Sequence, residues 1–255
     1  MRASIALAIR ESWAVLRAKG PSQIQFWFIA LAIGLAAGLA AVGFRLAIEG
    51  LQGAIYGTSD IAMLHSWART LPWYWVLITP IVGGALVGFI LTRFTDDGRV
   101  RSVADVIEGA ALKEGRVEVK AGLASAVASM ITLSSGGSTG REGPVVHLAG
   151  VISTKVSNLI RADGITGRDL LGCAVAAAVS ASFNAPIAGA LFALEIILRH
   201  FAMHAFAPIV IASATGTVVS RLWFGDITNF MLPSQNMLSF YVELPAFMML
   251  GLLSG

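Results

Sequence analysis

Two long apolar runs without a charged side chain dominate the first third of the chain. One covers residues 24–44 and the other covers residues 71–92. About 20 consecutive apolar residues form a helix long enough to cross the hydrocarbon core of a bilayer. Each run is therefore predicted to be a transmembrane helix, and the more polar residues 49–70 between them are predicted to form an external loop.

A pair of glycines four residues apart occurs in each predicted span, Gly34 with Gly38 and Gly84 with Gly88. Small residues at this spacing let the backbones of neighbouring membrane helices approach closely. We therefore expect each span to make a tight helix contact along its glycine face.

Beyond residue 101 the apolar segments become shorter, and glycine and proline interrupt them. A helix too short to cross the bilayer must end inside protein or against a water-filled cavity. Broken helices whose N-termini converge near the middle of the membrane form anion sites in transporters. The pattern predicts an all-α, multi-pass membrane protein with broken or re-entrant helices, and the alternative is a bundle of ordinary tilted spans. The predicted segments are residues 102–112, 119–134, 143–160, 168–183, 186–198 and 205–222.

Composition agrees with a membrane protein rather than a soluble one. Hydrophobic residues make up 56% of the chain and charged residues 13%, with a mean hydropathy of +0.76, whereas soluble domains carry about 25% charged residues. Positive charges gather at residues 2–19 and 93–101, which predicts that both segments face the cytoplasm. Residues 1–20 are predicted to form an amphipathic helix on the cytoplasmic membrane surface. The net charge of +3 fits this orientation and contact with anionic lipid, and no pattern indicates nucleic-acid binding.

Arg141 and Glu142 interrupt a long stretch that is otherwise free of charge. Residues 121–140 contain no Asp, Glu, Lys or Arg, and none occurs again until residue 155. An ionisable side chain at membrane depth is expensive and marks a functional site. The position of this pair within the predicted broken helices therefore indicates ion transport.

The residues around Glu142 suit an anion site at the start of a helix. Gly140 and Gly143 permit close approach of the backbone, and Pro144 fits a first helical turn because its missing N–H is not needed there. Backbone N–H groups at a helix N-terminus attract anions. The Glu142 carboxylate can thus occupy the place of an anion and move away when it is protonated. The alternative is a structural one, in which Glu142 caps the helix and pairs with Arg141.

The string Gly140-Arg141-Glu142-Gly143-Pro144 resembles the G-R-E-G-P motif of the chloride channel (CLC) family of anion channels and proton/chloride exchangers. A second stretch, residues 183–195, is similar to that family's F-N-A-P-x-[AG]-G-x-x-F-x-x-E motif. The resemblance covers nearly the whole chain but only the N-terminal half of the family's fold. Because the chain stops within an apolar run, we expect residues 21–255 to be the first half of a longer transmembrane domain.

The resemblance implies roles for several residues. Glu142 corresponds to the family's gating glutamate. Ser102 stands where an anion-coordinating serine is expected, although both flanking glycines and the proline of the family's G-[SK]-G-[IV]-P motif are replaced. A helix N-cap role for Ser102 is compatible with that position. The anion-binding residues implied by the resemblance are Ser102, Gly140, Arg141, Gly143 and Pro144.

The position of the family's proton-accepting glutamate is occupied by Ile196. Glu195 precedes it, about 100° around a helix axis. Glu195 could relay protons or could pair with Arg199 one turn later, and we favour the ion pair. Whether the protein is a passive channel or a proton-coupled exchanger is therefore left open by the sequence.

The resemblance further implies a homodimer with one pore per subunit and a dimer surface near residues 180–222. It implies a plasma membrane location, or the inner membrane in a bacterium, with a cytoplasmic N-terminus. Chloride or a similar anion would be the transported ion, without a cofactor or a bound metal. Proton-coupled antiport of fluoride or another anion is the alternative, because the surroundings of Ser102 are unusual. An intramembrane enzyme and a pore-less scaffold are remote alternatives, since no Ser–His–Asp or H-E-x-x-H spacing is present.

Overall fold

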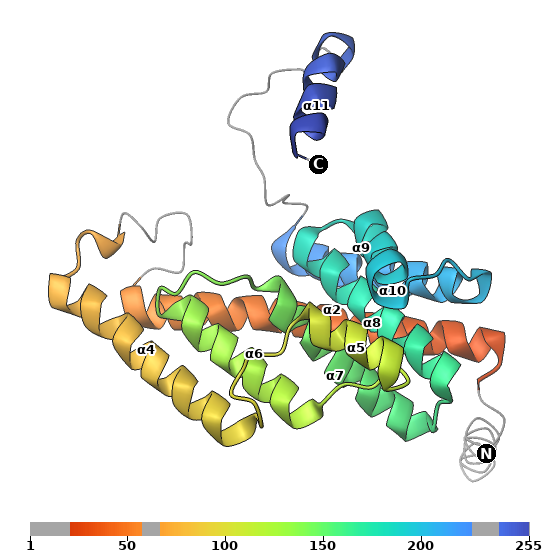
Figure 1. Cartoon of the computed structure of the whole chain (residues 1–255), viewed down its shortest axis with the longest axis horizontal. Coiled ribbons are helices and arrows are strands. Elements are labelled where there is room, and N and C mark those ends of the chain that lie inside the picture. Colours follow the sequence, from red (N-terminus) through yellow and green to blue (C-terminus); the bar gives the residue numbers. More distant parts are fainter. Residues whose placement is uncertain (1–20, 58–66, 226–239, 255) are drawn as a thin grey trace.

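The computed structural model describes residues 21–57, 67–225 and 240–254 of the chain (Figure 1). Every regular element within these ranges is a helix. The amphipathic helix predicted at residues 1–20 lies outside them. The all-α architecture predicted from the hydrophobic pattern is therefore confirmed for the part of the chain that is described.

The first apolar run forms a helix longer than predicted. Helix α2 (Gln23–Tyr56) begins after an N-cap serine and ends at Gly57, whose φ of 77° is left-handed. It continues past the expected boundary to Tyr56, with Ile48, Gln52 and Tyr56 buried, and Arg45 and Glu49, one turn apart, form an ion pair of 2.8 Å along the helix surface. The external loop expected from residue 49 therefore begins later, and its start was predicted wrongly.

The second run forms α4 (Trp73–Phe94), which is almost wholly exposed. Helices α2, α4 and α10 (Met203–Phe224) are long and apolar enough to cross a membrane. Helix α10 was expected to be among the shorter segments, but it extends beyond the predicted residues 205–222 at both ends.

The other predicted segments form helices with boundaries close to those expected. Helix α9 runs directly into a π-helical turn, so residues 186–198 form one short helix whose second half is π-helical. Helix α11 stands apart from the others in Figure 1. The elements are α5 (Val103–Leu112), α6 (Val119–Ser134), α7 (Glu142–Ile160), α8 (Gly164–Phe183), α9 (Pro186–Phe192), η2 (Ala193–Leu198) and α11 (Phe240–Ser254).

Helix α8 lies at the centre of the molecule and packs against α2, α7, α9 and α10. Residues 170–181 of this helix are all buried, and most of them are small. Small side chains let several helices approach one backbone closely. Cys173, the single cysteine of the chain, lies in this core and is fully buried.

The glycine pair in α2 forms the expected tight contact, and its partner is α10. A Cβ atom added at Gly34 would lie 2.8 Å from the Cα of Ala212, and one at Gly38 would lie 3.0 Å from the Cα of Gly216. These distances leave no room for a side chain, so the backbones of α2 and α10 touch.

The glycine pair in α4 does not form such a contact. A Cβ atom at Gly84 or Gly88 would meet no atom of the described residues within 4 Å. Gly83 faces α6 instead, where its Cβ would overlap the side chain of Ser135. The face of α4 that packs against α6 contains Gly83 and not the pair Gly84 and Gly88. The spacing of glycines in the sequence therefore did not predict which glycine lies in the helix contact.

Candidate anion site

Helices α5 and α7 begin beside each other, although about forty residues separate their starts in the sequence. A Cβ atom at Gly143, in the first turn of α7, would lie 3.7 Å from the Cα of Ser102 and 4.0 Å from the backbone nitrogen of Val103. Ser102 is the N-cap of α5. The positive ends of two helix dipoles therefore meet at one place, as expected for a site built from broken helices.

Glu142 is the first residue of α7, and its carboxylate folds back over the preceding loop. Its Oε2 atom would lie 3.0 Å from a Cβ at Gly140, so a larger residue there would crowd the carboxylate. Arg141 Nε lies 3.9 Å from Glu142 Oε1, and the Glu142 side chain remains 42% exposed. Glu142 thus sits at a helix N-terminus, where the sequence placed it.

The other residues of the motif have separate surroundings. Pro144 is buried in the first turns of α7. Arg141 lines a small cavity, together with residues of α2, α7, α8 and α10 such as Phe44 and Val145. The motif therefore places a carboxylate and a guanidinium at the same helix start.

The hydroxyl group of Ser102 is engaged within its own helix turn. It accepts a hydrogen bond from the Ala104 N–H group at 3.3 Å and donates one to Asp105 Oδ2 at 3.2 Å. The same Asp105 oxygen accepts the backbone N–H of Ser102 at 2.7 Å. This is a capping box, and the N-cap role considered for Ser102 is confirmed. The sequence signal for it, a serine followed three residues later by an aspartate, was not used in the prediction.

Two arginines hold the Asp105 carboxylate in place. Arg99 donates to both carboxylate oxygens, at 2.6 and 3.1 Å, and Arg101 Nη1 lies 3.5 Å from Oδ1. Partial burial by itself raises the pKa of Asp105, but the hydrogen bonds from Arg99 and from the Ser102 backbone outweigh it and lower the pKa to about 2. Asp105 therefore carries a full negative charge at neutral pH.

Arg101 braces the segment before α5 against α6. Its side chain is only 8% exposed and reaches Asp97 Oδ2 at 2.7 Å and Glu118 Oε2 at 2.8 Å. Its backbone N–H donates to the Oγ atom of the buried Ser125 in α6 at 2.9 Å. The start of α5 is thereby fixed relative to α6.

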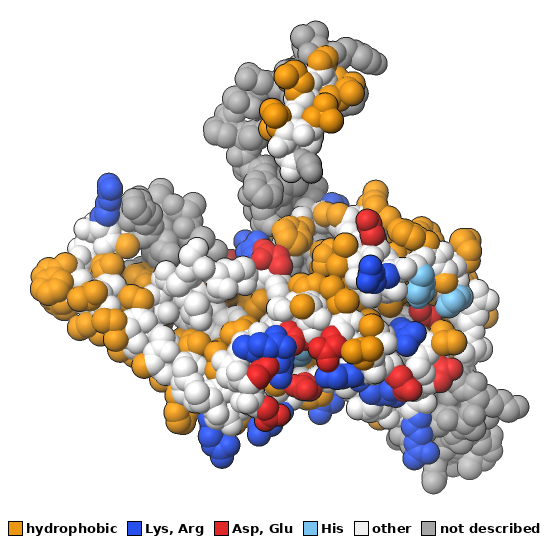
Figure 2. Space-filling view, viewed as in Figure 1, with side chains coloured by type: hydrophobic (Ala, Val, Ile, Leu, Met, Phe, Trp, Pro, Cys, Tyr) orange, Lys and Arg blue, Asp and Glu red, His pale blue; other side chains and the backbone are white. Residues whose placement is uncertain are grey.

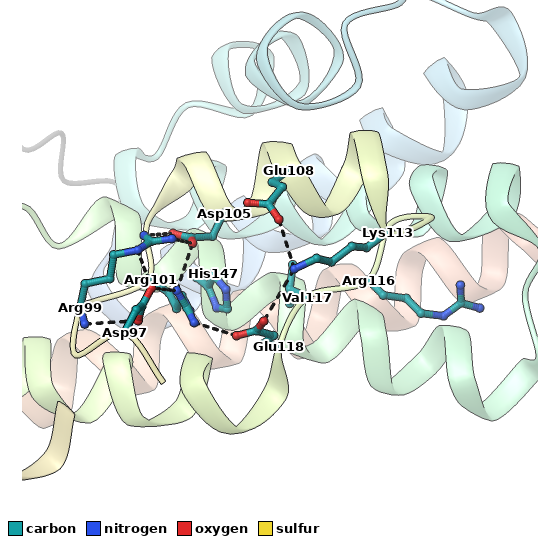
Figure 3. Close-up of a pocket in the computed structure, with 10 residues that line it drawn as sticks. All are labelled: Asp97, Arg99, Arg101, Asp105, Glu108, Lys113, Arg116, Val117, Glu118 and His147. Carbon is teal, nitrogen blue, oxygen red and sulfur yellow. Dashed lines mark hydrogen bonds and ion pairs between the residues drawn. The ribbon is translucent and has the colours of Figure 1, made fainter. Parts of the chain in front are cut away.

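These groups surround a pocket of about 200 Å³ beside α5 (Figure 3). Charged side chains of both signs line it, and they form a patch amid hydrophobic surface in Figure 2. His147 of α7 reaches the same pocket, but it is 1% exposed, and its Nδ1 atom would lie 2.5 Å from a Cβ at Gly122. His147 is therefore a packed helix residue. The lining residues are Asp97, Arg99, Arg101, Asp105, Glu108, Lys113, Arg116, Val117, Glu118 and His147.

The lowered pKa of Asp105 makes part of the folding stability dependent on acid. Since the folded-state pKa of about 2 lies below the ordinary value of 3.8, this contribution is present above about pH 4 and is lost as pH falls through 2. We expect Asp105→Asn to remove about 1 kcal/mol at pH 6, because its partner Arg99 is 52% exposed and water screens that ion pair, and to flatten the acid limb of the stability curve. Chemical unfolding in detergent between pH 2 and 6 measures the loss of stability at pH 6 and the slope of the acid limb, with Glu114→Gln as the control. An unchanged acid limb in Asp105→Asn would contradict the assignment.

The short helix after α8 places Glu195 and Ile196 on the surface. Both residues lie in the π-helical turn and are exposed. Among the described residues, Glu195 forms no ion pair with Arg199. The favoured ion pair was therefore wrong. Arg199 ends the π-helical turn in a left-handed conformation with φ 59°. Glu195 and Arg199 therefore do not lie one turn apart on a regular α-helix.

Three apolar spans, interrupted helices and converging helix N-termini define this chain as part of an integral membrane protein of the broken-helix class. The family model described as voltage gated chloride channel matches residues 83–255. The chain belongs to this family.

Named relatives agree with that assignment. A protein from Ralstonia nicotianae named as a ClcB-like chloride channel protein is 30% identical over 89% of this chain and 53% of its own length. The voltage-gated ClC-type chloride channel ClcB of Escherichia coli (strain SMS-3-5) is 28% identical over 76% of this chain and 46% of its own length. The chain thus spans about half the length of these relatives.

Two solved structures share the fold. A crystal structure of a CLC-type fluoride/proton antiporter matches with a TM-score of 0.65 and 26% identity, over 88% of this chain and 53% of the antiporter chain. A crystal structure of a eukaryotic CLC transporter matches with a TM-score of 0.61 and 19% identity, over 82% of this chain and 39% of the other.

Proposed function

We propose that this chain supplies the N-terminal half of a transmembrane chloride pathway in which Glu142 is the gating glutamate. The observation that carries the proposal is the position of Glu142 in the first turn of α7, with its carboxylate against Gly140, beside the start of α5. Family membership supports anion transport as the activity. The protein is then a channel or transporter rather than an enzyme, and it requires no cofactor or metal.

The chemistry follows from the helix termini. An anion in a membrane needs donors that replace its water shell but do not trap it. The first backbone N–H groups of a helix have no partner within it, and at the start of α7, where Gly143 leaves the backbone open, they meet that need. The Glu142 carboxylate folds over Gly140 at the same helix start. While ionised it competes with a transported anion, and when protonated it leaves the position free.

Proton coupling is the finer question. Ile196 replaces the family's proton-accepting glutamate, and Glu195 lies beside it on the exposed face of a π-helical turn. Glu195, without the expected partner at Arg199, is a candidate proton acceptor. A proton-coupled fluoride antiporter is the second candidate function, and the similarity to a solved fluoride/proton antiporter favours it.

We propose a membrane location and a dimeric assembly for the protein. We place the protein in the plasma membrane, or in the inner membrane of a bacterium, with the N-terminus in the cytoplasm. Two subunits would associate through helices near residues 180–222, each with its own pathway.

Halide flux from liposomes that contain the complete protein tests the proposal. We expect chloride efflux well above that of empty liposomes, and its absence for all halides would refute the proposal. The reversal potential under a pH gradient separates the mechanisms, because a passive channel follows the chloride gradient alone. Fluoride flux that chloride fails to inhibit would favour the second candidate function.

A further inference from the structure

The donors at the α5 N-terminus already have an anionic partner within the protein. The backbone N–H and the hydroxyl of Ser102 both point to Asp105 Oδ2, at 2.7 and 3.2 Å. Arg99 binds both oxygens of the same carboxylate. The Asp105 side chain is only 10% exposed, and Figure 3 shows it held between the two arginines.

A hydroxyl group has one proton to donate, and the proton of Ser102 is directed to Asp105. A transported anion bound at this hydroxyl would have to take that proton and would stand beside a carboxylate of the same charge. Like charges at such distances repel, and burial strengthens the repulsion. The Ser102 hydroxyl is therefore unsuited to coordinate an anion while Asp105 keeps its present position.

The sequence shows how this arrangement arises. Arg101 and Val103 stand where the glycines of the family pattern around Ser102 are expected, and Asp105 stands where its proline is expected. A proline could supply no carboxylate. Arg101 braces the segment through Asp97 and Glu118, so the same substitutions that remove the open glycine turn create a rigid, internally neutralised one.

We propose that Asp105 is a built-in anion that occupies the α5 N-terminus, so that the transported anion is bound by the α7 N-terminus and not by the Ser102 hydroxyl. This inference rests on the proposed function, because it concerns the route of an anion past the two helix starts. It makes Asp105 a specificity-determining residue, since removal of its charge would open a second set of donors.

A double-mutant cycle on the complete protein in liposomes tests the inference, with the apparent affinity for chloride as the readout. We expect Asp105→Asn, which keeps the shape of the side chain but removes the charge that repels an anion and weakens the acceptor of the Ser102 hydroxyl, to raise the affinity at least fivefold. Ser102→Ala should lower the affinity at least fivefold in the Asp105→Asn protein and less than twofold when Asp105 is present. Because Ser102 and Asp105 are in direct contact, a purely structural cap would couple them in stability, so the cycle is read on chloride affinity, with the unfolding stability of the same four proteins measured beside it.

The matched control is Asp97→Asn, which removes a carboxylate from the same two arginines without touching Ser102. We expect no change in affinity from it, and an effect equal to that of Asp105→Asn would overturn the inference. An equal loss from Ser102→Ala in both backgrounds would also overturn it. If Asp105→Asn fails to fold, the single variant Ser102→Ala still tests the inference. A fivefold loss of chloride affinity in that variant would show that the Ser102 hydroxyl binds the anion. Lack of any halide flux in the unmodified protein would instead refute the proposed function.

Discussion

Replacement of Glu142 by glutamine or alanine is expected to raise chloride flux at neutral pH about tenfold, equivalent to about 1.4 kcal/mol, and to remove the dependence of flux on pH. The reason is the position of the carboxylate at the first residue of α7, where its ionised form competes with an anion for the helix N-terminus. Glutamine keeps the shape of the protonated acid, and alanine removes the group. Halide efflux from liposomes with the complete protein, measured at several pH values, checks both parts.

Glu114→Gln is a suitable control, because Glu114 is an exposed partner of Arg116 in the loop after α5. The Glu114→Gln variant loses one negative charge, as the Glu142→Gln variant does, but at a position away from the start of α7. Unchanged flux and an unchanged pH profile in both Glu142 variants would exclude Glu142 from the mechanism and leave it as an acidic residue in the first turn of α7.

A second large effect is expected from Gly34→Ala in α2. The added methyl group would lie 2.8 Å from the backbone of Ala212, and neither backbone can move without separating α2 from α10. Over-packing of this kind costs about 1–3 kcal/mol. Thermal and chemical unfolding in detergent should show the loss directly.

The same helix supplies the control. A Cβ atom at Gly43 would meet nothing within 4 Å of the described residues, so Gly43→Ala should raise stability by about 0.5–1 kcal/mol through helix propensity. Equal effects at the two positions would show that α2 and α10 are not in contact as the structure has them.

The positions of most helices could be predicted from the sequence, because each boundary has a local cause. Runs of residues without charge predicted α2 and α4. Glycine or proline near the ends of the shorter segments predicted where those helices begin and end. The helix start at Glu142 was recognised within one residue for the same reason, since Gly140 and Pro144 restrict the backbone there.

Other features depend on contacts between distant segments and were missed. The extension of α2 beyond Phe44 buries Ile48, Gln52 and Tyr56 against the rest of the molecule, which a count of apolar residues that stops at Arg45 does not detect. The choice of Gly83 over Gly84 depends on the packing of α6. The role of Asp105 requires Arg99 and Ser102 to meet in one turn, and a capping-box search around Ser102 would have indicated part of it.

The buried thiol in α8 has a practical consequence for spectroscopy. Because Cys173 is the single cysteine of this chain and lies fully enclosed in its core, maleimide dyes and spin labels should leave it unmodified in the folded state. A reporter cysteine introduced at the surface of this region can then be labelled selectively without first removing a native one.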